Sequence, residues 1–428
     1  MKSDTSSRPV FDQPRAQMRI ELRKSKSHSA LLSVLGLTLG IAIGFAVPLC
    51  QSGAARADEF QNCLADLRAQ ARAHGISEAT LAKTVDGLRY DPEILPLLTN
   101  QPEFKTPIWD YLASLVDQER VDDGRGMLQH NSRTFAVAEQ RFGVERAVIA
   151  AVWGVESDFG RSFGTRPVIK SLATLSCAGP RQKYFRSELL AAVKIVDRGD
   201  IEPNQFNGSW AGAFGHTQFM PSTFLTTAVD LDGDGRRDLI NSIPDAIGST
   251  AAYLHKHGWT PGLDWGFEVS LPAHYAGPSG RTRKEPMSAW AARGLRRIDG
   301  APIAGSAHAG LLLPAGPNGP AFLVTRNFDA IYSYNAAESY ALAIALLSNR
   351  LRGRPGLVAA WPTDDPGLSR AERRELQTLL IRRGYDLDGK ADGVIGTKSR
   401  QAISDFQQRQ GLPANGRAGA KVLSALRQ

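Results

Sequence analysis

The sequence lacks the features of several common protein classes. No segment repeats with a period of about 20 to 50 residues, which excludes a solenoid. Glycine and proline, at 41 and 24 of 428 residues, are too few for a collagen-like or linker protein. Long apolar runs are scarce, which excludes a membrane channel. With 42% hydrophobic and 22% charged residues, the chain predicts a globular protein, and its length predicts two or more folded units.

Excess positive charge is confined to the two ends of the chain. Residues 1–57 hold eight Lys or Arg against three Asp or Glu, and residues 368–428 hold twelve against six. The segment between them, 58–367, is slightly acidic. The net charge of +8 therefore does not describe a nucleic-acid-binding surface, and we expect no nucleic-acid partner.

The N-terminus has the layout of a secretory signal peptide. A basic stretch at 19–26 precedes an apolar run from Ala30 to Cys50, and Ala55-Arg56-Ala57 then offers a small-residue cleavage site. We predict that residues 1–57 are removed on export to the periplasm. The alternative is an uncleaved leader that anchors the chain in the membrane, because about 20 apolar residues can span a bilayer.

Only three cysteines occur, and Cys50 leaves with the leader. The exported chain then holds Cys63 and Cys177, and two thiols in an oxidising compartment predict one disulfide. The alternative is two separate buried cysteines that act as small apolar side chains.

Helical periodicity dominates the rest of the chain. Apolar residues recur at three- and four-residue spacing in five segments, near 60–71, 108–115, 144–155, 242–255 and 336–350. Short runs among Gly and Pro between 266 and 328 predict a few strands. Residues 353–367 carry three prolines and three glycines and predict a linker to a small domain at 368–428. The predicted class is mainly α, in two domains.

Glu156 lies near the end of the predicted helix 144–157, among apolar neighbours. The helix dipole and desolvation both favour the protonated carboxyl, so we predict a raised pKa that suits a general acid. The alternative is an ordinary surface glutamate. Glycosidases usually need two carboxylates, but Asp158, two residues on, points to a different side of a helix. A single acid suggests that the substrate itself supplies the nucleophile.

A Gly-rich segment from Gly208 to Phe224, GSWAGAFGHTQFMPSTF, would let the backbone pass close beneath a ligand. Its aromatic residues Trp210, Phe214 and Phe219 are predicted to stack on sugar rings. The alternative is a segment that serves tight helix packing.

An Asp-rich loop follows at 230–245. Positions 1, 3, 5 and 6 of an EF-hand loop are matched by Asp230, Asp232, Asp234 and Gly235. Position 7 would use the backbone carbonyl of Arg236. Position 12 is Asn241 instead of a bidentate Glu, so a later carboxylate, Asp238 or Asp245, would have to complete the shell. We predict a structural Ca²⁺ here, with a metal-free turn as the alternative.

Taken in order, these motifs resemble the membrane-bound lytic transglycosylase B family. The resemblance covers about 59–350 and rests on GVESDFG around Glu156, the Gly-rich and Asp-rich segments, DAIGSTAAYLHKHGW and RNFDAIYSYNAAESYALAIALL. It implies a lysozyme-like helical catalytic domain at 58–352, with a small β-containing part and an EF-hand-like loop. The implied reaction cleaves the β-1,4 bond between N-acetylmuramic acid and N-acetylglucosamine in peptidoglycan and leaves a 1,6-anhydro-muramyl end.

The resemblance also implies residue roles. Glu156 is the catalytic acid/base, and the chemistry needs no cofactor. The implied substrate-binding residues are Ser209, Gln218, Met220, Tyr253, Tyr334, Asn335 and Tyr340. Peptidoglycan is the implied partner, and cell-wall synthesis or division proteins are candidate protein partners. Two alternative functions stay open, a muramidase that attacks the same bond with water and a non-catalytic wall-binding scaffold.

The C-terminal segment 368–428 resembles the peptidoglycan-binding domain type 1, a small three-helix unit. The residues that carry this resemblance include Gln377, Asp392-Gly393, Phe406-Gln407 and Gly411-Leu412. We expect much of this motif to serve the fold, and we expect the basic surface to suit an acidic polymer of glycan and peptide.

Overall fold

The computed structural model describes residues 51–98 and 106–428, with side chains from residue 58 onward. The predicted leader therefore lies outside the described side chains, and its last seven positions form the start of helix α1 (Gln51–Ala73). Within the described ranges, no helix combines the length and apolarity that a membrane span requires.

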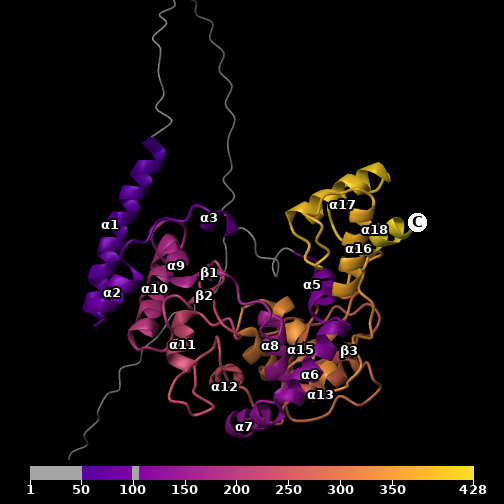
Figure 1. Ribbon diagram of the computed structural model, residues 1–428. Helices are drawn as coiled ribbons and strands as arrows, with labels where there is room; N and C mark the ends of the chain where they lie inside the picture. Colours follow the sequence, from indigo (N-terminus) through magenta and orange to yellow (C-terminus); the bar gives the residue numbers. More distant parts are fainter. Residues whose placement is uncertain (1–50, 99–105) are drawn as a thin grey trace, which may run out of the picture. The chain divides into compact units, whose positions relative to one another are not determined.

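The first domain is built around helix α8 (Arg146–Ser157), in which residues 147–154 are all buried. A helix that is apolar on every side belongs inside a protein, and α8 packs against α6, α7, α12 and α15 (Figure 1). The other helices of this domain are α2 (Glu78–Thr84), α3 (Ile94–Leu97), α5 (Ile108–Leu115), α6 (Gln118–His130), α7 (Ser132–Phe142), α9 (Val168–Cys177), α10 (Gln182–Asp197), α11 (Pro221–Thr227), α12 (Ile243–Lys256), α14 (Arg326–Tyr332) and α15 (Glu338–Leu351). The predicted helices at 108–115, 242–255 and 336–350 are confirmed as α5, α12 and α15.

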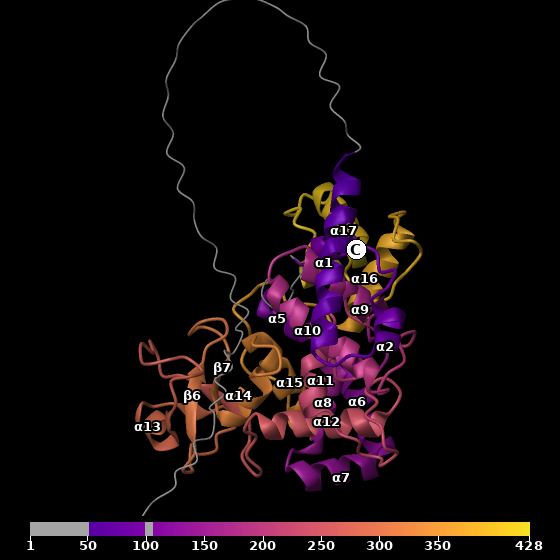
Figure 2. The same cartoon turned by 90° about the vertical axis from the view of Figure 1, so that its left-hand side faces the viewer.

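A five-stranded antiparallel sheet interrupts the helices. Its order is β4 (Glu285–Pro286), β6 (His308–Leu312), β7 (Ala321–Val324), β3 (Gly266–Ser270) and β5 (Arg296–Arg297). Gly266 pairs with Val324 and Val269 with Ala321, which sets the register of β3 against β7. One face packs on helix α13 (Met287–Ala292) around the buried Trp290, as a core separate from the helical one (Figure 2). The predicted β-containing part is confirmed.

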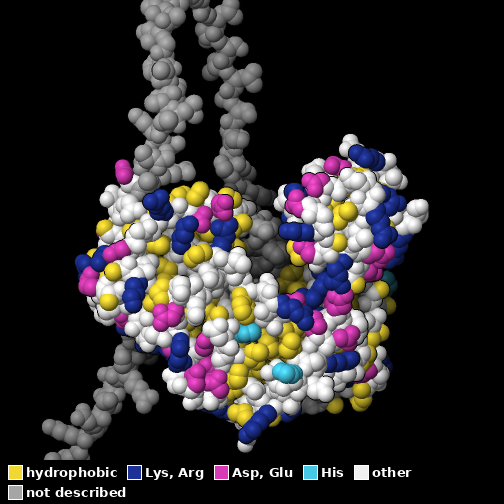
Figure 3. Space-filling model, in the orientation of Figure 1, with side chains coloured by type: hydrophobic (Ala, Val, Ile, Leu, Met, Phe, Trp, Pro, Cys, Tyr) yellow, Lys and Arg dark blue, Asp and Glu magenta, His cyan; other side chains and the backbone are white. Residues whose placement is uncertain are grey.

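The C-terminal domain consists of α16 (Arg370–Arg382), α17 (Thr397–Arg409) and α18 (Ala420–Arg427) around a core of its own. The predicted three-helix unit is therefore confirmed. Gln377 holds the loop between the first two helices, because its amide oxygen accepts from Gly393 N at 2.7 Å and its amide nitrogen donates to Val394 O at 3.0 Å. These motif residues thus serve the fold, while Lys and Arg side chains spread over the surface of this domain (Figure 3).

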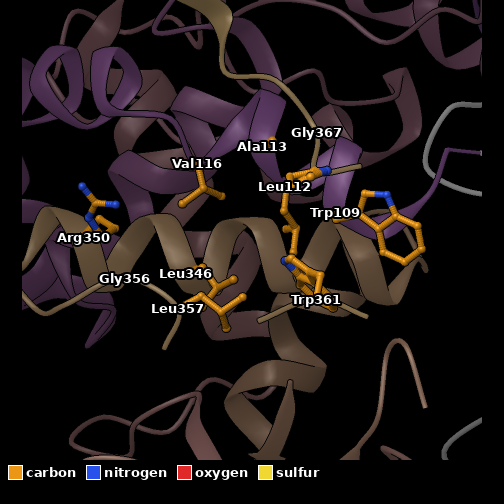
Figure 4. Close-up of a pocket in the computed structure, with 11 residues that line it drawn as sticks. Trp109, Leu112, Ala113, Val116, Leu346, Arg350, Gly356, Leu357, Trp361 and Gly367 are labelled. Atoms are coloured by element: carbon orange, nitrogen blue, oxygen red, sulfur yellow. The ribbon is translucent and has the colours of Figure 1, made fainter. Parts of the chain in front are cut away.

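The segment between the domains, 353–367, has no helix or strand but is held against the first domain. The backbone N–H groups of Val358 and Ala359 donate to the carboxylate of Glu268 on β3, at 3.0 and 2.7 Å. The Trp361 ring lies 6.5 Å from that of Trp109 on α5, beside a mainly apolar cavity of about 230 Å³ between α5, α15 and this segment (Figure 4). The segment is therefore held to the first domain at several points, although most of its residues are exposed.

Candidate active site

Glu156 occupies the last turn of α8. The helix ends directly after it because Asp158 and Phe159 adopt left-handed backbone conformations, with φ of 50° and 56°. For residues other than glycine this conformation costs roughly 1–2 kcal/mol each, so the surrounding contacts must hold the turn. The carboxylate of Asp158 is paired with Arg120 at 3.3 Å, with Arg161 at 3.4 Å and with Arg370 at 3.0 Å.

The hydroxyl of Tyr340 on α15 donates a hydrogen bond to Oε1 of Glu156. Tyr340 is 2% exposed, and its ring lies 6.3 Å from the ring of Tyr334. Tyr334 is in turn 4.6 Å from Tyr253 of α12. The three predicted tyrosines therefore form one aromatic wall beside the acid, and we call these three residues the tyrosine wall.

The tyrosine wall is fixed by backbone acceptors. Tyr253 donates to Ser333 O and Tyr334 donates to Thr217 O, both at 2.8 Å. Burial and then the negative charge of Glu156 raise the pKa of Tyr334 and Tyr340 well above their usual value. Both hydroxyls therefore remain protonated and can donate hydrogen bonds throughout the pH range in which an enzyme works. Asn335 directly follows Tyr334 in the turn before α15 and is half-buried.

The Gly-rich segment begins after β2 (Asn207–Gly208), which pairs with β1 (Arg166–Pro167). The hydroxyl of Ser209 accepts from Ala213 N at 3.1 Å and so closes the first turn. At Gly215, φ is 70° and a Cβ would lie 2.3 Å from Leu239 O, so only glycine fits there. At Gly215 the segment therefore packs closely against the backbone at Leu239, and its path beneath a ligand stays a prediction.

Two predicted substrate residues in this segment also serve the fold. The side-chain amide of Gln218 donates to Phe163 O at 3.1 Å and to Gly215 O at 2.9 Å. Met220 is half-buried and precedes the first residue of α11. The prediction that Phe214 and Phe219 stack on sugars is wrong, because they are 0% and 2% exposed and pack in the core.

His216 is a site residue that the sequence reasoning missed. Its ring Nδ1 accepts from Trp153 Nε1 at 2.9 Å, and its backbone carbonyl accepts from Ser157 Oγ at 2.7 Å. Burial lowers the pKa of His216 to about 4, so the ring is neutral near pH 7. His216 thus joins the Gly-rich segment to the helix that carries Glu156.

Glu188 on α10 was also missed, and it anchors the other end of this segment. Its side chain is almost fully buried, and its two carboxylate oxygens accept from the backbone N and the hydroxyl of Ser222, at 2.9 and 2.7 Å. Burial raises the pKa of Glu188. A buried acid directly before two leucines, Leu189 and Leu190, gives no signal in the sequence that separates it from a surface residue.

The Asp-rich loop brings Asp230, Asp232 and Asp245 together, with one carboxylate oxygen of each within 4.8 Å of the others. Asp245, in the first turn of α12, is fully buried, and its oxygens accept from Leu231 N and Asp238 N at 2.8 Å each. Of the two acids predicted to complete the shell, Asp245 therefore joins the cluster, and oxygen ligands of this kind suit Ca²⁺.

The other predicted ligands have partners of their own. The carboxylate of Asp234 accepts from Arg236 N at 2.8 Å. Asp238 instead accepts from the backbone N and the side-chain amide of Asn241, at 2.8 and 2.9 Å. The guanidinium of Arg236 donates to Asp200 O at 3.3 Å, a contact that does not involve the backbone carbonyl predicted to bind the metal. The three-carboxylate cluster is thus smaller than the predicted set.

Comparison with known proteins gives two matching family models. The model described as transglycosylase SLT domain matches residues 59–349, and the model described as putative peptidoglycan binding domain matches 369–426. Membrane-bound lytic murein transglycosylase B of Escherichia coli is 31% identical over 294 residues, which cover 63% of this chain and 77% of that protein.

Two solved structures extend the comparison. SltB3 of Pseudomonas aeruginosa in complex with NAG-anhNAM-pentapeptide is 42% identical, with a TM-score of 0.69 and coverage of 86% of this chain and 99% of that one. Escherichia coli Slt35 in complex with calcium is 29% identical, with a TM-score of 0.61 and coverage of 70% and 94%. The fold therefore has counterparts among solved lytic transglycosylases.

Proposed function

This chain belongs to the transglycosylase SLT domain family and is a peptidoglycan lytic transglycosylase, and from this premise we propose how it works. It cleaves the β-1,4 bond between N-acetylmuramic acid and N-acetylglucosamine and closes a 1,6-anhydro ring on the muramyl unit. The observation that carries this proposal is a single glutamate beside the tyrosine wall, while the neighbouring acid, Asp158, is paired with three arginines.

One carboxyl group is enough for both proton transfers. Protonated Glu156 donates its proton to the glycosidic oxygen as the bond from that oxygen to the muramyl C1 breaks. The resulting carboxylate is stabilised by the Tyr340 hydroxyl. It then takes the proton from the muramyl C6 hydroxyl, whose oxygen forms a bond to C1. No water is consumed, and Glu156 returns to its protonated state.

Product chemistry tests this proposal. Purified sacculi would be digested with the protein comprising residues 58–428, and the released muropeptides would be analysed by mass spectrometry beside a lysozyme digest. We expect muramyl products one water lighter than those of lysozyme. Reducing-end products would instead show a muramidase, and sedimentation with the sacculi without any product would show a scaffold.

We also propose that Asp230, Asp232 and Asp245 hold a structural Ca²⁺. The support is the convergence of their oxygens and the calcium bound in the structurally similar Slt35. Millimolar Ca²⁺ is expected to raise the thermal unfolding midpoint relative to EDTA, because an ion that binds only the folded state stabilises it. Mg²⁺, which prefers a tighter octahedral shell, should have a smaller effect.

Variants make the calcium prediction specific. Asp232→Asn removes an exposed ligand and is expected to abolish the Ca²⁺-dependent shift, while the midpoint in EDTA changes little. Asp386→Asn, an exposed acid of the C-terminal domain, is the control and should keep the full shift. A shift that survives in Asp232→Asn would place the ion elsewhere.

Export to the periplasm is the remaining proposal. The support is the basic, apolar and small-residue pattern of residues 1–57 together with the location of peptidoglycan in the cell envelope. The intact mass of the exported protein should correspond to a chain that begins at Asp58. The mass of the full 428 residues would indicate an uncleaved membrane anchor.

A further inference from the structure

The first turns of α16 carry three arginines, Arg370, Arg373 and Arg374. Cations are disfavoured at this end of a helix, because the N-terminus is the positive end of the helix dipole. Helix α16 already has a capping box, formed by Ser369 and Glu372, so its own start does not require the arginines. Their placement points to negative partners outside the C-terminal domain.

Those partners are carboxylates of the first domain. The guanidinium of Arg370 contacts both oxygens of Asp158, with Nη2–Oδ1 at 3.0 Å and Nη1–Oδ2 at 3.2 Å. Its Nε is 3.9 Å from both Asp117 and Glu119, and Arg374 pairs with Glu119. A bidentate arginine–carboxylate pair defines direction as well as distance, so it fixes how the two groups lie.

Asp158 belongs to the turn that ends the catalytic helix, two residues after Glu156. Arg120, a second partner of Asp158, is itself buried and donates to Gly154 O in the same turn. Within the first domain, Asp123 and Asp158 also share the partly exposed Arg161, at 2.5 and 3.4 Å. Arg370 therefore completes a charge cluster that surrounds the left-handed turn after Glu156.

A second contact fixes the orientation of the C-terminal domain. Arg417, which precedes α18, binds Asp110 of α5 through Nη2 at 2.6 Å and Nε at 2.7 Å. It also pairs with Asp365 at the end of the packed interdomain segment. With two such contacts, the domain is held in one position within residues 52–428, which form one compact unit.

We propose that Arg370 is a positioning residue for catalysis. By holding Asp158, it keeps the turn after α8 in its left-handed conformation and thereby keeps Glu156 aligned with the tyrosine wall. The C-terminal domain then contributes to the rate of the chemical step as well as to wall binding. This inference rests on the proposed role of Glu156 as the acid/base.

The test uses a soluble, uncross-linked glycan–peptide fragment as substrate, so that retention on the wall does not contribute. In the protein comprising residues 58–428, Arg370→Gln is expected to lower kcat about tenfold and to change KM less than twofold, as expected when reacting groups are misplaced. Arg370→Lys keeps the charge without the bidentate geometry and should recover only part of kcat.

Arg427→Gln is the matched control. Arg427 makes an equally bidentate pair with Glu375, at 2.7 and 2.8 Å, but within the C-terminal domain, so this variant should keep the wild-type kcat. A kcat of Arg370→Gln within twofold of wild type would overturn the proposal, and so would an equal loss in Arg427→Gln. Products of wild type and variants are identified in the same assay, so reducing-end products or an inactive wild type would count against the proposed function itself.

Discussion

Replacing Glu156 by Gln is expected to lower kcat about a thousandfold or more on peptidoglycan, with little change in binding to sacculi. General acid–base catalysis contributes about 10²–10⁴ in rate, and here one group is both the acid and the base. A glutamine can still accept the hydrogen bond from Tyr340, so the site should keep its shape. The loss should therefore appear in kcat, measured from the release of anhydro-muropeptides.

Glu145→Gln is the control for this substitution. Glu145 precedes the same helix at its other end, where it pairs with Arg352. The substitution makes the same chemical change in a partly buried ion pair at the opposite end of that helix, and it should leave kcat within about twofold because the reacting groups keep their positions. Substantial activity in Glu156→Gln would refute the single-carboxylate mechanism and direct the search to a second acid.

The disulfide is expected to have the largest effect on stability. It is confirmed between Cys63 of α1 and Cys177, the last residue of α9, with Cα atoms 5.8 Å apart. The two cysteines are 114 residues apart in the sequence, and cross-links of such long loops remove much of the entropy of the unfolded chain. The double variant Cys63→Ser, Cys177→Ser should lose about 3 kcal/mol of unfolding free energy.

Urea unfolding with and without reductant measures this loss. Reduced wild type and the double variant should unfold at the same lower urea concentration, whereas reductant should not change the double variant. Hydrogen exchange should quicken first in α1, because the cross-link ties this helix to the domain. Equal midpoints for oxidised wild type and the double variant would show that α1 is held by its packing alone.

Local patterns in the sequence predicted much of the fold. Helices α5, α12 and α15 were predicted to within about two residues, because apolar spacing along a helix depends only on neighbouring residues. The strand prediction was less complete: the run from Ala321 to Phe328 begins as β7 but continues as α14, which the side chain of Thr325 caps. Two-residue strands such as β5 carry no periodicity that could be recognised.

The site was harder to predict where it depends on distant contacts. Phe214 and Phe219 are aromatic residues of the kind that stack on sugars, and only the folded structure shows that they are buried in the core. Only the fold of the loop shows that Asp245, and not Asp238, lies beside Asp230 and Asp232. Arg370 and Asp158 are 212 residues apart in sequence, and the residues around each of them do not predict that the two side chains are in contact.

The end of the catalytic helix is thus held by two contacts that differ in charge. The contact through Arg370 is ionic and partly buried, so mobile ions in the cell envelope screen it in part. The contact through His216 is neutral, because Nδ1 accepts a hydrogen bond from the Trp153 indole N–H and the proton of the imidazole ring is therefore on Nε2. Changes in ionic strength therefore act on the first contact and leave the second intact, so a saline medium weakens the contact of the C-terminal domain with the turn after α8 without breaking the contact of the Gly-rich segment with α8.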